Sequence, residues 1–301
     1  SRMDCTEKSM SRLGVSIAAL TLSLLAMTGQ AHASMDDKDV AKLTSFGGTC
    51  ASCDLAGRKL MNAKFTGANF ARSTLIGADL RGAMFYGSNF TRADLSRADL
   101  RGAEMRGANF SFATFTGAKM SGIESSGANF TGAIMSRVDL SSAELHGAQF
   151  ESAQLQGAKL ANIELTGSNF QNVDARDADF SNADINHANF QDGRFDGASF
   201  RNADLSGTNM RGASLVRADF RNADISNVML AGADLSGARG LDQEQLDEAC
   251  GDNRTRLPSG LSIRSCNGRS TRILLLREMP KAPRAPAAPP APPAPPSPPR
   301  R

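Results

Sequence analysis

A large apolar residue recurs at every fifth position from residue 55 to residue 235, without a single insertion. Of these 37 positions, 35 hold Leu, Phe, Met or Ile, and only Ser125 and Ala175 depart from the pattern. Ala dominates two residues earlier, and Asp, Asn or Glu often stands between the two, as in residues 78–80. A period of five fits neither an amphipathic helix nor an alternating strand. The pattern therefore predicts a repeat architecture.

A second period, of twenty residues, lies on top of the first. Phe recurs at this spacing within the apolar register, and a column of amide side chains precedes it by one residue. Both columns are explained if residues twenty apart lie above one another on one side of a four-sided coil, with the Phe column buried. The Phe column comprises Phe70, Phe90, Phe110, Phe130, Phe150, Phe170 and Phe190, and the amide column comprises Asn69, Asn89, Asn109, Asn129, Gln149, Asn169, Asn189 and Asn209.

The five-residue pattern resembles the pentapeptide-repeat family over about 190 of the 301 residues. The resemblance implies an all-β fold, a right-handed quadrilateral parallel β-helix with four pentapeptides per coil and a short helical C-terminal cap. We expect residues 54–240 to form this solenoid, residues 34–53 to form an N-terminal lead-in and cap, and residues 241–279 to form the C-terminal cap region. No Pro occurs between residues 34 and 257, which suits an unbroken backbone ladder.

The N-terminal 33 residues resemble an export signal preceded by upstream sequence. Arg12 and the apolar run 13–27 follow an expected start at Met10, and Ala31-His32-Ala33 is typical of a cleavage site. Cleavage after Ala33 would leave a periplasmic or secreted protein with no stable membrane anchor, and an uncleaved anchor helix is the alternative. Residues 280–301 are rich in Pro and Ala, which predicts a disordered tail or an extended spacer.

Four cysteines remain after the expected cleavage, which in an exported protein suggests two disulfides. Cys50 and Cys53 precede the first coil, whereas Cys250 and Cys266 follow the last one. Nine coils at ~4.8 Å would separate the two pairs by about 40 Å, far beyond the ~7 Å that a disulfide allows between Cα atoms. We therefore expect Cys250–Cys266, while the bonding of Cys50 to Cys53 stays open. A thioredoxin-type dithiol is the alternative for Cys50 and Cys53, but its βαβ context is absent from the sequence.

One outward-facing column is acidic. It has two interpretations: a stripe that binds a cation or a basic partner, or a row of side chains that accept hydrogen bonds from the backbone at each corner. Ion pairs of Arg101 with Glu104, Arg201 with Asp204 and Arg221 with Asp224 are plausible from the spacing. The column, called the acidic column below, comprises Glu104, Glu124, Glu144, Glu164, Asp184, Asp204 and Asp224.

The charge balance and the placement of the His residues limit which classes of function fit the sequence. The net charge is +3, and residues 54–240 carry 20 acidic and 19 basic side chains, a net of −1, whereas a DNA mimic needs a strongly negative rod. His146 and His187 lie on separate coils, so no catalytic or metal-binding cluster is expected. We predict a non-enzymatic exported scaffold that binds a protein or envelope partner, with no cofactor, no metal and no nucleic acid. The alternative is a DNA-mimicking regulator of a topoisomerase.

Overall fold

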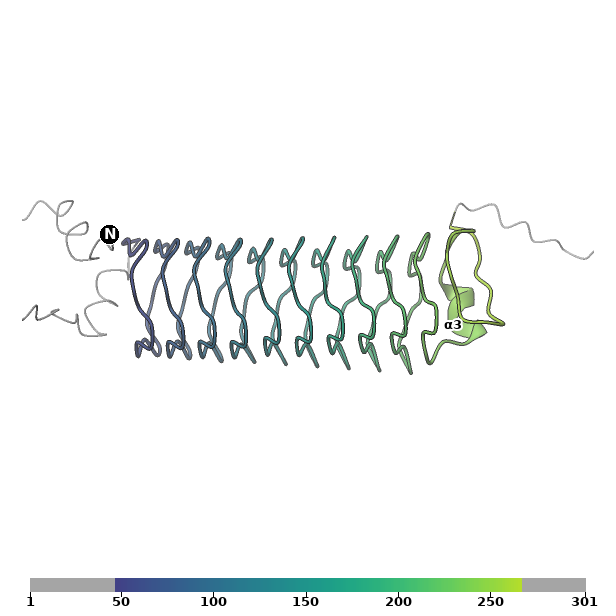
Figure 1. Ribbon diagram of the computed structural model, residues 1–301, viewed down its shortest axis with the longest axis horizontal. Helices are drawn as coiled ribbons and strands as arrows, with labels where there is room; N and C mark the ends of the chain where they lie inside the picture. The colour runs from purple at the N-terminus through teal and green to yellow at the C-terminus, as the bar shows by residue number, and fades with distance from the viewer. Residues whose placement is uncertain (1–46, 267–301) are drawn as a thin grey trace, which may run out of the picture. The chain divides into compact units, whose positions relative to one another are not determined.

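In the computed structural model, the described part of the chain is residues 47–266. The expected signal segment 1–33, the lead-in residues 34–46, residues 267–279 and the tail 280–301 lie outside the described residues, so the predictions made for them stay predictions. The described part consists of successive coils, followed by a C-terminal segment that contains the helix α3 (Gln243–Glu248) (Figure 1).

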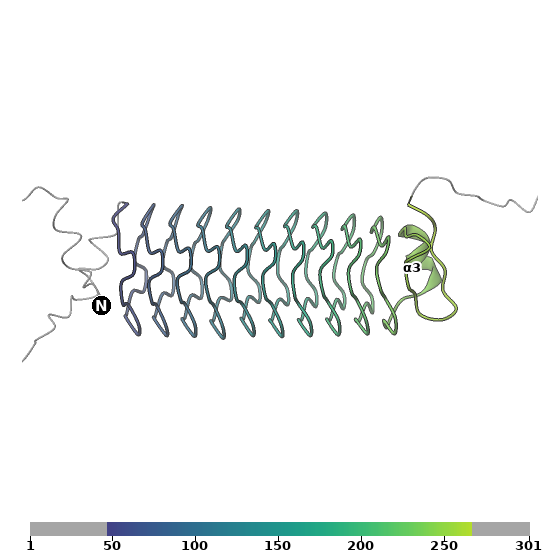
Figure 2. The same ribbon diagram turned by 45° about the horizontal axis from the view of Figure 1, so that its top comes forward.

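Each coil contains twenty residues and pairs in parallel with the next coil. The unbroken series of bridges runs from Thr49–Asn69 to Asp219–Arg239, with one bridge for every five residues and a constant offset of twenty. The hydrogen bonds run in both directions: Leu80 N–H donates to Asp99 O at 2.7 Å, and Asp99 N–H donates to Ala78 O at 2.9 Å. The predicted four-sided coil with a period of twenty is therefore confirmed, and Figure 2 shows the coils repeating along one axis.

The Phe column forms a continuous stack inside the coils. All seven of its members have no exposed surface, and the ring centroids of successive members lie 4.6–5.2 Å apart. Such ring contacts contribute about 1 kcal/mol per pair beyond the burial of apolar area. Ser125 and Ala175, which interrupt the apolar register, are buried as well, and the Oγ of Ser125 has no hydrogen-bond partner.

Small residues two positions before each large apolar residue also face inward. Most are Ala, because four side chains converge on one narrow axis at each level of the stack. Where a hydroxyl replaces the methyl group, it donates to a backbone carbonyl inside the coil: Ser168 Oγ lies 2.7 Å from Leu145 O, and Thr208 Oγ1 lies 3.1 Å from Ile185 O. These hydroxyls are buried without leaving a polar group unpaired.

Every corner of the coil uses the same left-handed residue. The second residue after each large apolar position has φ between 55° and 73° at every corner from Ser52 to Gly237. This is position i+2 of a type II turn, where Gly is free of strain and other residues cost about 1–2 kcal/mol. Gly fills half of these corners, and the rest hold mostly Asn, Arg, Ser and Asp, with one Phe and one His.

Large side chains at these corners lie over the same corner of the following coil. Phe112 lies over Gly132, and Arg137 lies over Gly157. A Cβ atom at position 132 would come within 2.5 Å of the Phe112 ring, whereas a Cβ at Gly127 would have no neighbour within 4 Å. Glycine therefore serves two purposes at position 132, since it tolerates the left-handed backbone and leaves space for the ring.

We expect Gly127→Ala to lower the free energy of unfolding by about 1–2 kcal/mol, because only the backbone conformation is penalised. Gly132→Ala should cost about 0.5–1 kcal/mol more, because the Phe112 ring must swing away and lose its contact with Arg92. Denaturant unfolding of the two variants measures the difference. In a Phe112→Gly background the excess should vanish, and an excess that persists there would contradict this account.

The helix α3 follows the last regular coil and interrupts the series of bridges that recur every five residues. Asp242 accepts a hydrogen bond from Gln245 N–H at 2.9 Å, and the Gln245 side chain accepts from Asp242 N–H at 3.1 Å, which forms a capping box. Leu246 has no exposed surface, and Glu248 O accepts from Asn227 N–H of the preceding coil at 2.9 Å. Beyond α3 the ladder resumes with the bridge between Met229 and Cys250.

Two disulfides lie at the two ends of the described part. Cys250 and Cys266 are bonded, with 4.8 Å between their Cα atoms, and Cys266 N–H donates to Gly251 O at 3.0 Å. Cys50 and Cys53 are also bonded, with 5.3 Å between their Cα atoms, and they join the two ends of the first described corner. The structure thus contains no bond between the N-terminal and C-terminal pairs.

Candidate functional site

The acidic column forms one continuous row on the outside of the coils. Its seven members are joined by consecutive parallel bridges, so each lies directly above the member twenty residues earlier. All seven side chains are exposed or half-buried. The inside–outside assignment made from the sequence, with the Phe column buried and the acidic column at the surface, is therefore confirmed.

The aspartates of the column are bonded to their own corners. Asp204 and Asp224 each accept a hydrogen bond at 2.9 Å from the backbone N–H two residues ahead, and Asp184 accepts from the Asn186 side chain at 2.6 Å. Partial removal from water raises the pKa of Asp204, but the hydrogen bonds from Ser206 and Asn186 and the nearby His187 outweigh this and lower the pKa. This half of the column fits the hydrogen-bonding interpretation.

The glutamates of the column extend outward instead. Glu124 pairs with Arg106, and Glu164 lies 3.0 Å from His146 Nε2, each partner coming from the corner of the preceding coil. Within the described part, the side chains of Glu104 and Glu144 have no hydrogen bond or ion pair, although their backbones take part in the ladder. We call residues Glu104, Glu124, Glu144 and Glu164 the glutamate stripe, because none of their carboxylates bonds to its own corner as the aspartates do.

The arginine pairs expected for this column are wrong. Arg101 donates to Asp99 at 2.7 and 2.8 Å, and Arg221 donates to Asp219, in both cases across two residues on the preceding side of the coil. No ion pair between Arg201 and Asp204 is found among the described residues. For Arg101 and Arg221 the reason is geometric: the guanidinium folds back to a carboxylate two residues earlier, whereas the residue three positions ahead lies beyond the corner. Arg201 has Ser199 at that earlier position, so it has no carboxylate there and this reason does not apply to it.

The amide column explains why Asn and Asp are favoured in this register. Asn109 Oδ1 accepts from Ser111 N–H at 3.0 Å, and Asn129 Oδ1 accepts from Thr131 N–H at 2.9 Å. Neighbouring amides also bond along the axis, as from Asn209 Nδ2 to Asn189 Oδ1 at 3.0 Å. A short side chain with an acceptor oxygen three bonds from Cα completes the corner as an Asx turn, which Glu is too long to do in the same way.

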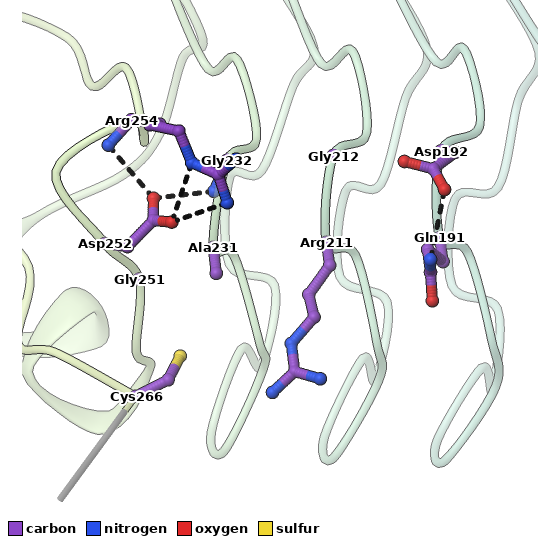
Figure 3. A pocket seen from close by; sticks show the side chains of 10 residues that line it. All are labelled: Gln191, Asp192, Arg211, Gly212, Ala231, Gly232, Gly251, Asp252, Arg254 and Cys266. Carbon is purple, nitrogen blue, oxygen red and sulfur yellow. Dashed lines mark hydrogen bonds and ion pairs between the residues drawn. The ribbon is translucent and has the colours of Figure 1, made fainter.

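A groove of about 600 Å³ lies between the last coils and the C-terminal segment. Asp252 lies at the end of the groove formed by the C-terminal segment: Oδ1 accepts from Gly232 N–H at 2.8 Å, and Oδ2 accepts from Arg254 Nη2 at 3.1 Å (Figure 3). Arg211 points into the groove without a dashed contact to the residues drawn. This groove was not predicted from the sequence, although most of its lining residues recur at a spacing of twenty, at positions 191/192, 211/212, 231/232 and 251/252.

The bonds of Asp252 also set its acidity. Removal from water raises the pKa of Asp252, but hydrogen bonds from the Gly232 backbone, Arg254 and Thr255 outweigh it and lower the pKa to about 2. The carboxylate therefore stays charged at neutral pH and fastens the C-terminal segment to the preceding coil through Gly232.

We expect acid to loosen this connection. Since the pKa falls from its usual value of about 4 in the unfolded chain to about 2 in the folded one, the stabilisation is complete above about pH 4 and is lost as the pH falls toward 2. Pepsin cleavage within residues 241–266 should therefore accelerate in the wild type below pH 4. Asp252→Asn should be cleaved readily throughout and lose this pH dependence relative to wild type, whereas equal pH profiles would contradict the assignment.

No helix in the described residues is long and apolar enough to cross a membrane. Residues 47–266 also contain no group of three or more His, Cys, Asp or Glu side chains placed to hold a metal ion.

Two solved structures show what kind of protein this chain is similar to. HetL, a pentapeptide repeat protein involved in heterocyst differentiation regulation from the cyanobacterium Nostoc sp. strain PCC 7120, is 25% identical over 72% of this chain and 91% of that chain, with a TM-score of 0.33. Full-length QnrB1, a plasmid-mediated fluoroquinolone resistance protein, is 23% identical over 68% and 94% of the two chains, with a TM-score of 0.26. No curated protein sequence matches significantly.

The family comparison covers most of the coils. The model described as pentapeptide repeats matches residues 50–85, 59–97, 85–122, 126–162, 163–202 and 198–237, which together make up more than half of the chain. These matches coincide with the bridges that define the twenty-residue coil. The chain therefore belongs to the pentapeptide-repeat family.

Proposed function

We propose that this protein is an exported, non-enzymatic scaffold that binds a protein or envelope partner through the outside of its coils. The observation that carries the proposal is the filled interior: the large apolar residues from Leu55 to Leu235 are buried. A ligand would therefore bind at the outer surface, where the ladder holds side chains at a regular spacing. Right-handed winding of the coils, implied by the family, belongs to the same proposal.

The glutamate stripe is the surface that we assign to a basic partner. Four carboxylates stand in one row at the spacing of the ladder, and two of them have no partner within the described residues. A row of this kind favours lysine and arginine side chains in an extended segment, and its attraction should weaken with salt. The three aspartates of the acidic column are outside this proposal, because their oxygens are engaged with their own corners.

Cross-linking in the cell that produces the protein tests this assignment. Glu104→Gln and Glu144→Gln, alone and together, should reduce the yield of the main cross-linked partner progressively, and the partner should carry a basic segment at the contact. Glu151→Gln is the matched control, because Glu151 is an exposed corner glutamate outside the stripe. An unchanged yield in the double variant, or an equal loss in the control, would refute the role of the stripe.

Export is a separate element of the proposal and rests on the sequence of residues 10–33 alone. Mass spectrometry of the protein purified from its own cell should find an N-terminus at Ser34. A cytosolic protein that begins at Met10 would refute export and would revive the topoisomerase alternative, although the near-neutral charge of residues 54–240 still opposes DNA mimicry.

We also propose that α3 and the residues around it cap the array. Repeat arrays need an end that shields the last apolar cross-section from water. Leu246 and Ala249 have no exposed surface, and the Gln245 side chain donates to Ala223 O of the preceding coil at 2.9 Å. These contacts support a capping role for the segment.

A further inference from the structure

Phe112 is an unusual residue for the surface of this protein. Its side chain is 54% exposed, and its φ of 59° places it in the left-handed region at a corner. Fourteen of the sixteen Phe residues occupy the buried register, and Phe112 is one of the two that do not. Gly occupies half of the equivalent corners without strain. A Phe here is unfavourable in two ways, because its ring is exposed to water and its backbone is held in the left-handed region.

The surroundings hold the ring in place. The ring lies over Gly132, where even a Cβ atom would approach it within 2.5 Å, and the Arg92 guanidinium lies 5.8 Å from the ring centroid. A cation at that distance is attracted to the face of an aromatic ring. Both neighbouring coils therefore position Phe112. Arg92, twenty residues earlier, contacts the ring, and Gly132, twenty residues later, leaves space for it.

The same corner combines apolar surface with positive charge. Ile134, two residues beyond Gly132, is 37% exposed, and of the three large apolar side chains exposed in residues 47–266, two are Phe112 and Ile134. Arg72 and Arg92 occupy the two preceding levels of the corner column, and neither has an ion pair among the described residues. We call Arg72, Arg92, Phe112 and Ile134 the aromatic corner.

We propose that the aromatic corner docks an extended, acidic segment of a partner protein that carries an apolar anchor residue. Phe112 and Ile134 offer the contact for the anchor, and the two unpaired guanidiniums favour carboxylates beside it. The inference rests on the proposed scaffold function but concerns a different surface. The side of the coil that bears the amide column separates the aromatic corner from the glutamate stripe.

The two surfaces differ in the charge that they select. The glutamate stripe favours basic segments, whereas the aromatic corner favours acidic ones, because its corner positions 71–72, 91–92, 111–112 and 131–132 hold two arginines and no acidic residue. Asp94, in the column of Ile134, is engaged with the backbone and hydroxyl of Ser96. The aromatic corner should also depend less on salt, because part of its affinity comes from apolar contact rather than from charge.

Fluorescence anisotropy with a labelled synthetic peptide tests the proposal on the full chain. The probe has a central Leu-Phe pair flanked by glutamates. One control peptide keeps the apolar pair and has lysine flanks, and the other keeps the glutamates and has a Gly-Ser centre. The protein variants are Phe112→Gly, Arg72→Gln and Arg92→Gln. Arg137→Gly is the matched control, because it also replaces an exposed left-handed corner residue that lies over a glycine.

The acidic apolar peptide should bind more tightly than both controls, and Phe112→Gly should weaken binding at least about tenfold. Arg72→Gln and Arg92→Gln should each weaken it several-fold, and Arg137→Gly should leave it unchanged. Both glycine variants should unfold at a higher denaturant midpoint than wild type, because each removes left-handed strain; lost binding in Phe112→Gly would then reflect the missing ring rather than misfolding.

Other results would overturn the inference. These are no wild-type binding up to the order of 1 mM, equal binding of the lysine-flanked peptide, or full binding by Phe112→Gly. Self-association of the wild type that disappears in Phe112→Gly would also overturn it and would assign the corner to a second copy of the chain. If the peptide does not bind the wild type while the variants of the glutamate stripe still lose their cross-linked partner, the docking role of the aromatic corner is refuted and the scaffold function stands.

Discussion

Phe130→Ala should lower the free energy of unfolding by about 3–5 kcal/mol, as measured by denaturant unfolding. Phe130 has no exposed surface and stacks between Phe110 and Phe150, at centroid distances of 5.2 and 4.9 Å. Truncation removes both ring contacts and leaves a cavity that the coil cannot close, because each coil is fixed by ladder bonds to the coils on either side.

The surface control is Glu144→Ala, which should change the free energy of unfolding by no more than about 0.5 kcal/mol. Glu144 lies in the acidic column on the outside of the coils, and its side chain is exposed and has no hydrogen bond or ion pair within the described residues. Hydrogen exchange adds a spatial test, because stability in a repeat array is a sum over neighbouring coils. Protection should fall most in the coils around Phe130, and a large loss in Glu144→Ala would contradict the assignment of inside and outside.

The coil could be predicted from sequence because one constraint repeats at each level. An inward position has to be apolar in all coils, so the register appears 37 times and is insensitive to Ser125 or Ala175. The period of twenty was visible for a similar reason: Phe stacks on Phe, and Asn bonds to Asn, along the axis. In the regular coils the sequence pattern also predicts the contacts between distant residues, because each residue pairs with the one twenty positions away in the next coil.

The acidic column shows where this reasoning ends. Sequence placed its seven members in one row but treated Asp and Glu as equivalent, whereas one methylene group decides whether the carboxylate reaches the N–H two residues ahead. Two of the expected arginine pairs were also wrong because of side-chain length: the long guanidinium side chains of Arg101 and Arg221 reach back to Asp99 and Asp219. Side-chain length, which the pattern of residue classes ignores, determines which groups remain available to a partner.

The aromatic corner and the C-terminal groove were missed for two different reasons. Phe112 had a visible signal, since it is a Phe outside the buried register, but its strain and its contact with Gly132 depend on the corner conformation. The groove around Asp252 does have a periodic signal, because residues 191/192, 211/212, 231/232 and 251/252 are spaced by twenty and Asp252 bonds to Gly232 at this spacing. The signal was missed because the apolar register ends at Leu235 and α3 follows it, and the offset of the next bridges changes to 21 at Cys250 and to 22 at Arg256.

Loss of the Cys250–Cys266 bond should destabilise the C-terminal segment by about 3 kcal/mol, since the bond closes a loop of about 15 residues in the unfolded chain. The double variant Cys250→Ala/Cys266→Ala tests this without leaving a free thiol. The other polar connections of the segment to the last coils are limited: α3 bonds to Asn227 and Ala223, and two ladder bridges continue. Three further side-chain contacts join Asp252 to Gly232, Thr255 to Leu230 and Arg256 to Asp234. A loss of this size should therefore open the segment before the coils unfold.

Hydrogen exchange distinguishes this local opening from general destabilisation. The amides of Cys250 and Arg256, which donate to Val228 and Ala233, should exchange markedly faster in the double variant. The amide of Leu145, about five coils away, should be nearly unaffected, because coils contact only their neighbours. The matched control is Cys50→Ala/Cys53→Ala: it also removes one disulfide, but the loop between its cysteines spans a single corner, so the entropic effect should be much smaller and confined to the first described coil. Equal loss of protection along all coils in the Cys250/Cys266 variant would show that the bond supports the whole stack rather than its end.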